Sequence, residues 1–261
     1  MKVTITGNPE ELGGAAARAI AQGLTDAIAE NGKARLVLST GKSQFETLSV
    51  LVGLPVEWKR VEIFHLDEYL GLSEQHPASF RRYLRERVLK WIDPARVHLI
   101  DPSAGPSVQW VVDDLTAQIR QAPIDVAVIG IGENGHIAFN DPPADMATRA
   151  GYKVVDLDTQ CRLQQVHEGW FPSLQDVPKQ AITMTVYQIL QARHIVCPVP
   201  HAAKAQAIRD TLTHTTTAMI PATALWQHPD VHLYLDHASA SGFSAEQLQR
   251  ITGAEELAPL L

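Results

Sequence analysis

Three groups of residues in this sequence could transfer protons or bind an anion. The first is the segment 130–141, GIGENGHIAFND, where three glycines stand beside Asn134, His136 and Asp141. Glycines such as Gly132 let backbone approach a ligand closely or adopt positive φ angles. A histidine can exchange protons near neutral pH, and Asp141 could orient His136 or balance its charge. The segment therefore predicts a loop that holds a proton-transferring histidine against a ligand.

The second group is the acid pair Asp67 and Glu68, in the segment HLDEYLGL that follows an apolar run. Neighbouring side chains of an extended chain point to opposite faces, so at most one of the two acids faces a given site. A carboxylate partly removed from water at such a strand end could act as a general base. The alternative is that either acid caps a helix N-terminus, and the two residues alone favour this alternative.

The third group could bind an anion. Ser39, Thr40, Gly41, Lys42 and Ser43 lie between an expected strand and an expected helix. Hydroxyls and free N–H groups at a helix N-terminus favour a phosphate, and Lys42 would add a positive charge. The alternative is that a hydroxyl only caps the next helix. No glycine precedes Gly41 at the spacing of the P-loop, which argues against a nucleoside triphosphatase.

Lys204, in the segment PVPHAAKAQAI, is expected in the first turns of a helix that follows a strand. From there its side chain could reach back over the sheet edge to a phosphate. Most helical lysines are solvated, so Lys204 suggests a phosphate site only in combination with the other three segments.

Helical and strand periods alternate along the chain and would position these residues. Apolar residues repeat every three or four positions in the predicted helices and run together in the predicted strands. The alternation predicts an α/β fold with a mostly parallel sheet, flanked by helices on both faces. Ligands of such sheets bind beyond the carboxyl ends of the strands. With no repeat or flexible linker, residues 1–261 are expected to form one domain. The predicted strands are Arg35–Ser39, Arg60–Leu66, Val97–Ile100, Ile124–Ile129, His194–Val199 and Val231–Leu235; the predicted helices are 12–28, one from about Ser43, Arg81–Trp91, Val108–Ile119 and one from about His201.

Composition narrows the function classes. The net charge of -7 and the lack of a basic tract argue against nucleic acid or an anionic membrane as the main partner. The two cysteines, Cys161 and Cys197, lie far apart and lack any C-x-x-C spacing, which excludes a disulfide scaffold or a zinc site built on a cysteine pair. The N-terminus has no apolar signal core, and no run approaches the ~20 apolar residues of a membrane span. We therefore expect a soluble, cytoplasmic protein.

A dinucleotide site is the rival interpretation of the glycine-rich segment. Gly130, Gly132 and Gly135 match the spacing G-x-G-x-x-G. The match lies in the middle of the chain, however, and the Pro142-Pro143 pair that follows would block the crossover helix which that site requires. The residues therefore argue against a nicotinamide cofactor.

Taken together, these segments resemble the glucosamine-6-phosphate deaminase family, which is grouped with 6-phosphogluconolactonases and galactosamine-6-phosphate isomerases. The shared segments are S-T-G near residue 40, HLDEYLGL at 65–72 with HPASF at 76–80, GIGENGHIAFNDPP at 130–143, and Lys204. The resemblance runs from about residue 10 to 236. The run Ile137-Ala138-Phe139-Asn140 has the deaminase form, whereas lactonases have a stretch of the type T-A-S-L-F-P after the histidine.

This resemblance implies a modified Rossmann-like fold and a set of roles. Asp67 would move a proton from C2 to C1 of an opened aminosugar phosphate, and His136 would open the sugar ring. Asn134 matches a position that is Asn or Asp in the family, and Asp141 matches a position that is usually Glu. The phosphate would lie against the segment 40–43, with Lys204 closing over it and Gly132 lining the site. The products would be fructose 6-phosphate and ammonia. No metal and no organic cofactor is implied.

Departures from the family pattern leave the sugar open. Asp141 is one methylene shorter than Glu, so its contact with His136 is expected to be longer or bridged by water. Lys42 stands where a small residue is usual. The family's additional phosphate-contacting arginine falls near His167, with Arg162 the nearest arginine.

Three other functions compete with the deaminase: the same reaction on galactosamine 6-phosphate, hydrolysis of 6-phosphogluconolactone, and a catalytically silent sugar-phosphate sensor. Hydrolysis would release no ammonia and would depend less on Asp67. A homo-oligomer stays open, because some relatives are hexamers and others monomers. The final residues, ELAPLL, show no counterpart of a regulatory segment, so activation by an acetylated aminosugar phosphate is not expected.

Overall fold

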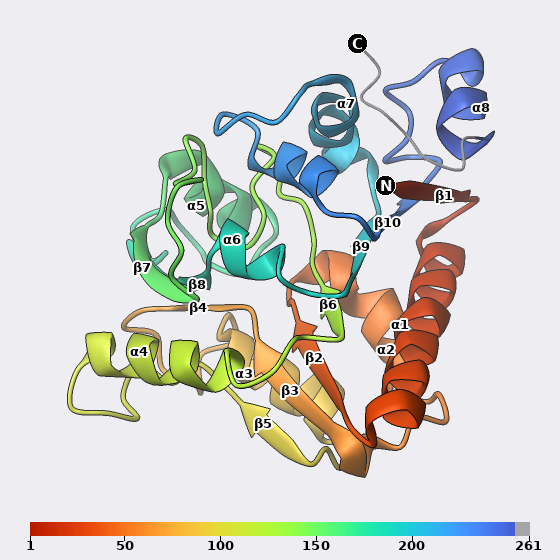
Figure 1. Ribbon diagram of the computed structural model, residues 1–261. Helices are drawn as coiled ribbons and strands as arrows, with labels where there is room; N and C mark the ends of the chain where they lie inside the picture. Colours follow the sequence, from red (N-terminus) through yellow and green to blue (C-terminus); the bar gives the residue numbers. More distant parts are fainter. Residues whose placement is uncertain (254–261) are drawn as a thin grey trace.

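A computed structural model describes residues 1–253 of the chain (Figure 1). The segment ELAPLL, discussed above for its lack of a regulatory counterpart, lies outside these residues. No helix in the described part of the chain is long and apolar enough to cross a membrane.

A sheet of seven parallel strands forms the centre of the fold, in the order β1-β10-β9-β6-β2-β3-β5 (Figure 1). The predicted α/β class with a mostly parallel sheet is therefore confirmed. All six predicted strands are present, within two residues of the expected bounds at either end. The strands are β1 Lys2–Thr6, β2 Ala34–Leu38, β3 Val61–His65, β5 Arg96–His98, β6 Val126–Val128, β9 His194–Val199 and β10 Val231–Asp236.

Both faces of this sheet are covered by apolar side chains, because alternate residues of each strand point to opposite sides. On one face Leu36 and Leu38 pack with the apolar stripe of α1, as predicted for residues 12–28. On the other face Val37 packs with Phe64 and with Leu115 of α4. The fold is therefore held by its apolar core and not by a disulfide, and both cysteines of the described chain are free and buried.

The helices begin and end where local chemistry predicts. In α1, Asn8 accepts a hydrogen bond from the Glu11 N–H at 2.8 Å, Pro9 occupies the first turn, and Gly32 ends the helix at φ 73°. The predicted helix 81–91 is instead a short α-helix, α3, that continues as a π-helical turn over Arg85–Leu89. The helices are α1 Pro9–Asn31, α2 Phe45–Leu51, α3 Phe80–Leu84, α4 Val108–Ile119, α5 Thr159–His167, α6 Val186–Ile189, α7 Ala205–Thr213 and α8 Ala245–Gly253.

A second, antiparallel sheet was not predicted from the sequence. Its three strands are β4 (Asp67–Tyr69), β8 (Gln180–Met184) and β7 (Tyr152–Asp156), in that order. Leu66 joins the two sheets, because its N–H donates to Leu38 O at 3.1 Å while its carbonyl accepts from the Met184 N–H at 2.9 Å. This junction fixes Asp67 directly beyond the carboxyl end of β3.

The segment between β6 and β7 contains no helix. It forms an irregular loop with a bridge between Ile137 and Asn140 and a cis bond between Pro142 and Pro143. The helix that a dinucleotide site requires is therefore absent after the glycines, as the proline pair predicts.

Candidate active site

The carboxyl ends of four neighbouring strands open into one pocket. Strands β9, β6, β2 and β3 are adjacent in the sheet, so the loops that follow them meet at one edge. The pocket there has a volume of about 590 Å³, including its open mouth. All four segments that the sequence singled out converge on it. Its wall consists of Ser39, Thr40, Gly41, Lys42, Ser43, Gln44, Leu66, Asp67, Phe80, Gly130, Ile131, Gly132, His136, Ala138, Phe139, Gln164, Gln165, Glu168 and Lys204.

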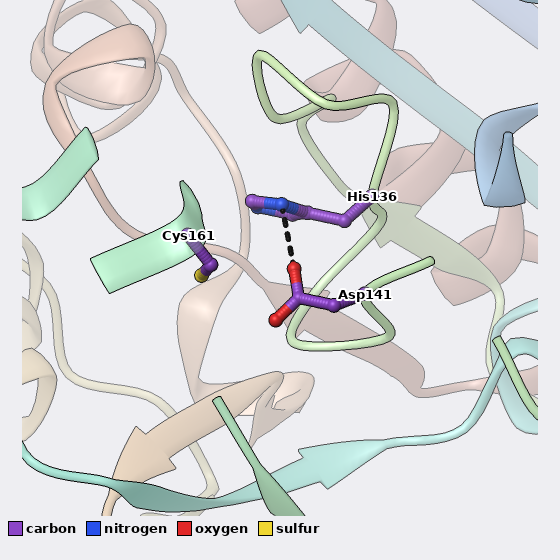
Figure 2. Close-up of side chains that lie close together, drawn as sticks. All are labelled: His136, Asp141 and Cys161. Carbon is purple, nitrogen blue, oxygen red and sulfur yellow. Dashed lines mark ion pairs between the residues drawn. The ribbon is translucent and has the colours of Figure 1, made fainter. Parts of the chain in front are cut away.

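His136 is held in the pocket wall by its own loop (Figure 2). Its Nδ1 lies 2.6 Å from Asn134 Oδ1 and 3.1 Å from Asp141 Oδ1. Its backbone closes the loop, because the Gly132 N–H donates to the His136 carbonyl at 2.9 Å. With Nδ1 engaged and no partner on Nε2 in residues 1–253, Nε2 is the nitrogen that can exchange a proton with a ligand.

Gly132 is required by this packing. A Cβ at Gly132 would overlap the imidazole of His136, so no other residue fits without moving the ring. Gly135 adopts φ 80°, a conformation that favours glycine, and its N–H donates to Gly132 O at 3.0 Å. The glycines therefore shape the backbone around the histidine.

Asp141 is anchored on both carboxylate oxygens. Oδ1 accepts from Asn134 Nδ2 at 3.3 Å, and Oδ2 accepts from the Asp158 N–H at 3.3 Å. Burial alone would raise the pKa of Asp141, but the hydrogen bond and charge of His136 hold that pKa below its ordinary value. The expected water bridge to His136 is wrong, since the two side chains meet directly at 3.1 Å; the longer contact stays a prediction. The anchored carboxylate fixes the orientation of the imidazole.

Asp67, at the start of β4, also lines the pocket and is only 6% exposed. Its carboxylate accepts no hydrogen bond from the described residues. Burial, together with the neighbouring charge of Glu68, raises the pKa of Asp67 to about 8. Such a carboxyl can both take up and release a proton near neutral pH, as general base catalysis requires.

Glu68 points away from the pocket and caps a helix. Its buried carboxylate accepts from the N–H groups of Phe80 and Arg81, at 3.2 and 2.8 Å, and from the Ser79 hydroxyl at 2.9 Å. The guanidinium of Arg81 lies 3.4 Å away. The cap interpretation is therefore confirmed for Glu68, and Asp67 is the acid that lines the pocket, because the strand sends the two side chains to opposite faces.

Lys204 provides the positive end of the pocket. It lies in the short 3-10 helix Ala202–Lys204 before α7 and is only 5% exposed. Its ammonium forms no ion pair with any described residue. Burial lowers the pKa of Lys204, partly offset by the charges of Glu168 and Glu133. Beside it in the wall, the buried hydroxyl of Ser39 has no hydrogen-bond partner within residues 1–253. A buried cation and a free hydroxyl are suited to an anionic group.

The sequence matches the family model described as glucosamine-6-phosphate isomerases/6-phosphogluconolactonase over residues 7–234. The chain belongs to this family. Among its curated relatives, glucosamine-6-phosphate deaminase 1 of Bacillus subtilis (strain 168) is 34% identical over 92% of this chain and 99% of the relative. The glucosamine-6-phosphate deaminase of Lactobacillus delbrueckii subsp. bulgaricus is 31% identical over the same shares of the two chains.

Solved structures of the family have the same fold. A monomeric glucosamine-6-phosphate deaminase superposes with a TM-score of 0.84 at 32% identity, covering 93% of this chain and 100% of that one. A 6-phosphogluconolactonase from Shewanella baltica OS155 gives a TM-score of 0.74 at 21% identity, covering 90% of this chain and 97% of that one. The second likeness shows the fold alone.

The family's additional arginine has no counterpart in this pocket. The guanidinium of Arg162 donates to the carbonyls of Leu174 and Val177, at 2.6 and 3.1 Å, and does not line the pocket. His167 lines a neighbouring hollow together with Asn134. Lys42 lines the pocket but is exposed, with its ammonium 5.9 Å from the centre of the Trp170 ring.

Helix α5 supplies wall residues that the sequence did not single out. Gln164, Gln165 and Glu168 face the pocket, and Glu168 is held by Gln164 Nε2 at 2.7 Å and Trp170 Nε1 at 3.1 Å. A helical reading of CRLQQVHEGWF would have placed residues 161, 164, 165 and 168 on one face, which is the signal that could have found them.

Proposed function

We propose that this chain is a glucosamine-6-phosphate deaminase, which converts glucosamine 6-phosphate and water to fructose 6-phosphate and ammonia. The observation that carries the proposal is the placement of two proton-transferring groups in one pocket. Asp67, whose pKa is raised to about 8, and His136, with its anchored Nδ1, both line this pocket. The curated relatives named above as deaminases support the same reaction.

The first step assigned to this site is the opening of the sugar ring. His136 Nε2 takes the proton of the anomeric hydroxyl and returns a proton to the ring oxygen, so no net proton is lost. A single imidazole can both accept the first proton and release the second. Asp141 and Asn134 hold Nδ1, which keeps the ring of His136 in one orientation during the exchange.

The second step is enolisation. The Asp67 carboxylate removes the proton from C2 of the open aminosugar and delivers it to C1, while a proton passes from the amino nitrogen to O1, so that C1 becomes a hydroxymethyl group and C2 an imine. The resulting C2 imine takes up water, and ammonia leaves. Because Asp67 accepts no hydrogen bond from the described residues, its carboxylate is free to approach the substrate, and desolvation strengthens it as a base.

The phosphate is assigned to the end of the pocket formed by Lys204 and the segment Thr40–Ser43. Lys204 is buried and has no ion-pair partner in the described chain, so an anion would compensate its charge. Binding energy gained there, remote from the reacting carbons, can position C1 and C2 between the two proton-transferring groups.

We further propose that residues 1–261 act as one domain in a reducing, cytoplasmic environment. The single central sheet and its two continuous apolar faces support the first part. The free, buried state of Cys161 and Cys197 supports the second.

The test compares three substrates on one protein preparation. Glucosamine 6-phosphate, galactosamine 6-phosphate and 6-phosphogluconolactone are each supplied, and ammonia and acid release are recorded separately. Ammonia from glucosamine 6-phosphate at the highest kcat/KM is the expected result. Ammonia from the galactosamine sugar alone would change the substrate, and acid release from the lactone without ammonia would overturn the proposal. Binding of all three without turnover would indicate a sensor.

A further inference from the structure

Three side chains of metal-binding chemistry converge behind the pocket wall (Figure 2). His136 and Asp141 come from the loop after β6, and Cys161 from the first turn of α5. One nitrogen, one carboxylate oxygen and the sulfur all lie within 4.8 Å of one another. The thiol of Cys161 is free, and its residue is 1% exposed.

We propose that His136, Asp141 and Cys161 form a binding site for a soft divalent transition-metal ion, with Zn²⁺ as the ion that fits best. Imidazole, carboxylate and thiolate are the three ligand types of protein zinc sites. The ion would inhibit the reaction, since it would withdraw His136 and Asp141 from proton transfer. This last consequence rests on the proposed function, whereas the binding itself does not.

Binding requires His136 Nδ1 to give up its contact with Asn134 Oδ1, at 2.6 Å, and to carry its proton on Nε2 instead, and it requires the sulfur to move closer. Tetrahedral Zn²⁺ with bonds of about 2.0–2.3 Å separates its ligand atoms by roughly 3.2–3.7 Å. His136 Nδ1 and Asp141 Oδ1 are already 3.1 Å apart. Sulfur, within 4.8 Å of both ligand atoms, has to approach by no more than about 1.5 Å. Three protein ligands leave one position for a water or an inhibitor, and His136 connects the site to the open pocket.

The charges around the sulfur favour a cation. The carboxylate of Asp141 lies within 4.8 Å of the sulfur, and the carboxylate of Asp158 accepts a hydrogen bond from the Cys161 N–H at 2.6 Å. Negative charges so close to the sulfur attract a divalent ion. On binding, the ion displaces the thiol proton, which leaves to solvent. One thiolate, one carboxylate and a neutral imidazole then cancel the charge of the ion.

Tyr69 gives a second, independent indication. Its hydroxyl is buried and has no hydrogen-bond partner within the described chain. Tyr69 and Cys161 belong to the same buried cluster of side chains. A thiol is a weak acceptor, but a metal-bound thiolate is a strong one. The unused O–H therefore provides the outer hydrogen bond that ligands of metal sites usually have.

The experiment titrates the reduced, metal-free full chain with Co²⁺, which replaces Zn²⁺ and reports a sulfur ligand by its thiolate-to-cobalt charge-transfer absorption. We expect this absorption to saturate at one ion per chain. Cys161→Ser should abolish it and weaken binding more than about tenfold. Cys197→Ser, at the other buried free cysteine, is the matched control and should leave the absorption unchanged. Circular dichroism checks that each variant is folded.

A second variant keeps the proposal testable if Cys161→Ser does not fold. His136→Asn retains the cysteine and should lose the same binding, measured as Zn²⁺ uptake by calorimetry. Absence of the cobalt–thiolate absorption in the native chain, or its persistence in Cys161→Ser or in His136→Asn, would overturn the proposal. Because none of these readouts uses turnover, a failure of the deaminase assay leaves them unaffected. In an active enzyme, inhibition by Zn²⁺ that a chelator reverses is the further expected result.

Discussion

Asp67→Asn is expected to make the protein more stable and less active at the same time. Burial and Glu68 raise the pKa of Asp67 from an ordinary 3.8 to about 8. The folded chain therefore binds this proton more tightly than the unfolded chain does. The stabilisation from the bound proton is complete below about pH 4 and is lost as the pH rises towards 8. Asparagine mimics the protonated acid at every pH and avoids this loss.

The size of the effect follows from the shift. At about 1.4 kcal/mol per pKa unit, the full shift corresponds to at most on the order of 6 kcal/mol, reached above pH 8. Structural relaxation will reduce this figure. A gain of only ~2 kcal/mol in the variant would still raise Tm by about 4–8 °C in a chain of this size. Loss of the general base should lower kcat by about 10²–10⁴.

Thermal unfolding of both proteins between pH 5 and 9 measures the difference. Asp93→Asn, at a surface position where the side chain is 83% exposed, is the control and should show no pH-dependent gain. In the same range, kcat/KM of the native enzyme should rise with pH, reach half of its maximum near pH 8 and level off towards pH 9, since the base must be ionised. If the stability gain of Asp67→Asn did not grow between pH 5 and 8, the carboxylate would not be desolvated, and the reasoning would be refuted.

Three further changes test the rest of the pocket. Lys204→Met should raise KM for the sugar phosphate roughly 10–100-fold, with a smaller effect on kcat, because a charge-assisted contact is worth about 1.5–3 kcal/mol. Exposed Lys179→Met is the control, and an unchanged KM in Lys204→Met would exclude this lysine from the phosphate site. Gly132→Ala should abolish turnover in a folded protein, because the new methyl group displaces the imidazole of His136. The control Gly14→Ala meets only the flexible end of Arg18 and should be neutral, and an active Gly132→Ala enzyme would contradict the packing described around His136. Glu68→Ala should lower the unfolding free energy by about 2–4 kcal/mol in chemical denaturation, since it leaves buried donors of Ser79, Phe80 and Arg81 unpaired. Exposed Glu86→Ala is the control, and a loss no larger than in that variant would show that the cap made by Glu68 is dispensable.

The central sheet could be predicted because its elements carry strong periodic signals. The apolar stripe of α4 predicts Val108–Ile119, which are the bounds found, and His194–Val199 is likewise found as predicted. The antiparallel sheet could not be predicted in this way. Strand β4 has three residues, too few to show a period, and its partner β8 lies more than a hundred positions away. These strands can be recognised only from their pairing with one another in the structure.

The sequence predicted residues that line the pocket but not how they are oriented. Alternation along β4 indicates that Asp67 and Glu68 diverge, but it does not indicate which one faces the pocket. The contacts of Glu68 with the first turn of α3 decide this, and they depend on tertiary structure. The burial of Lys204 is likewise a property of the assembled pocket, because the lysine side chain is usually solvated.

The deaminase proposal is best tested by following ammonia and fructose 6-phosphate together as they form from glucosamine 6-phosphate, with native protein and Asp67→Asn side by side. We expect both products in a one-to-one ratio from the native protein and loss of both in the folded variant. Full activity in Asp67→Asn, or no ammonia from a native protein that binds the sugar phosphate, would contradict it.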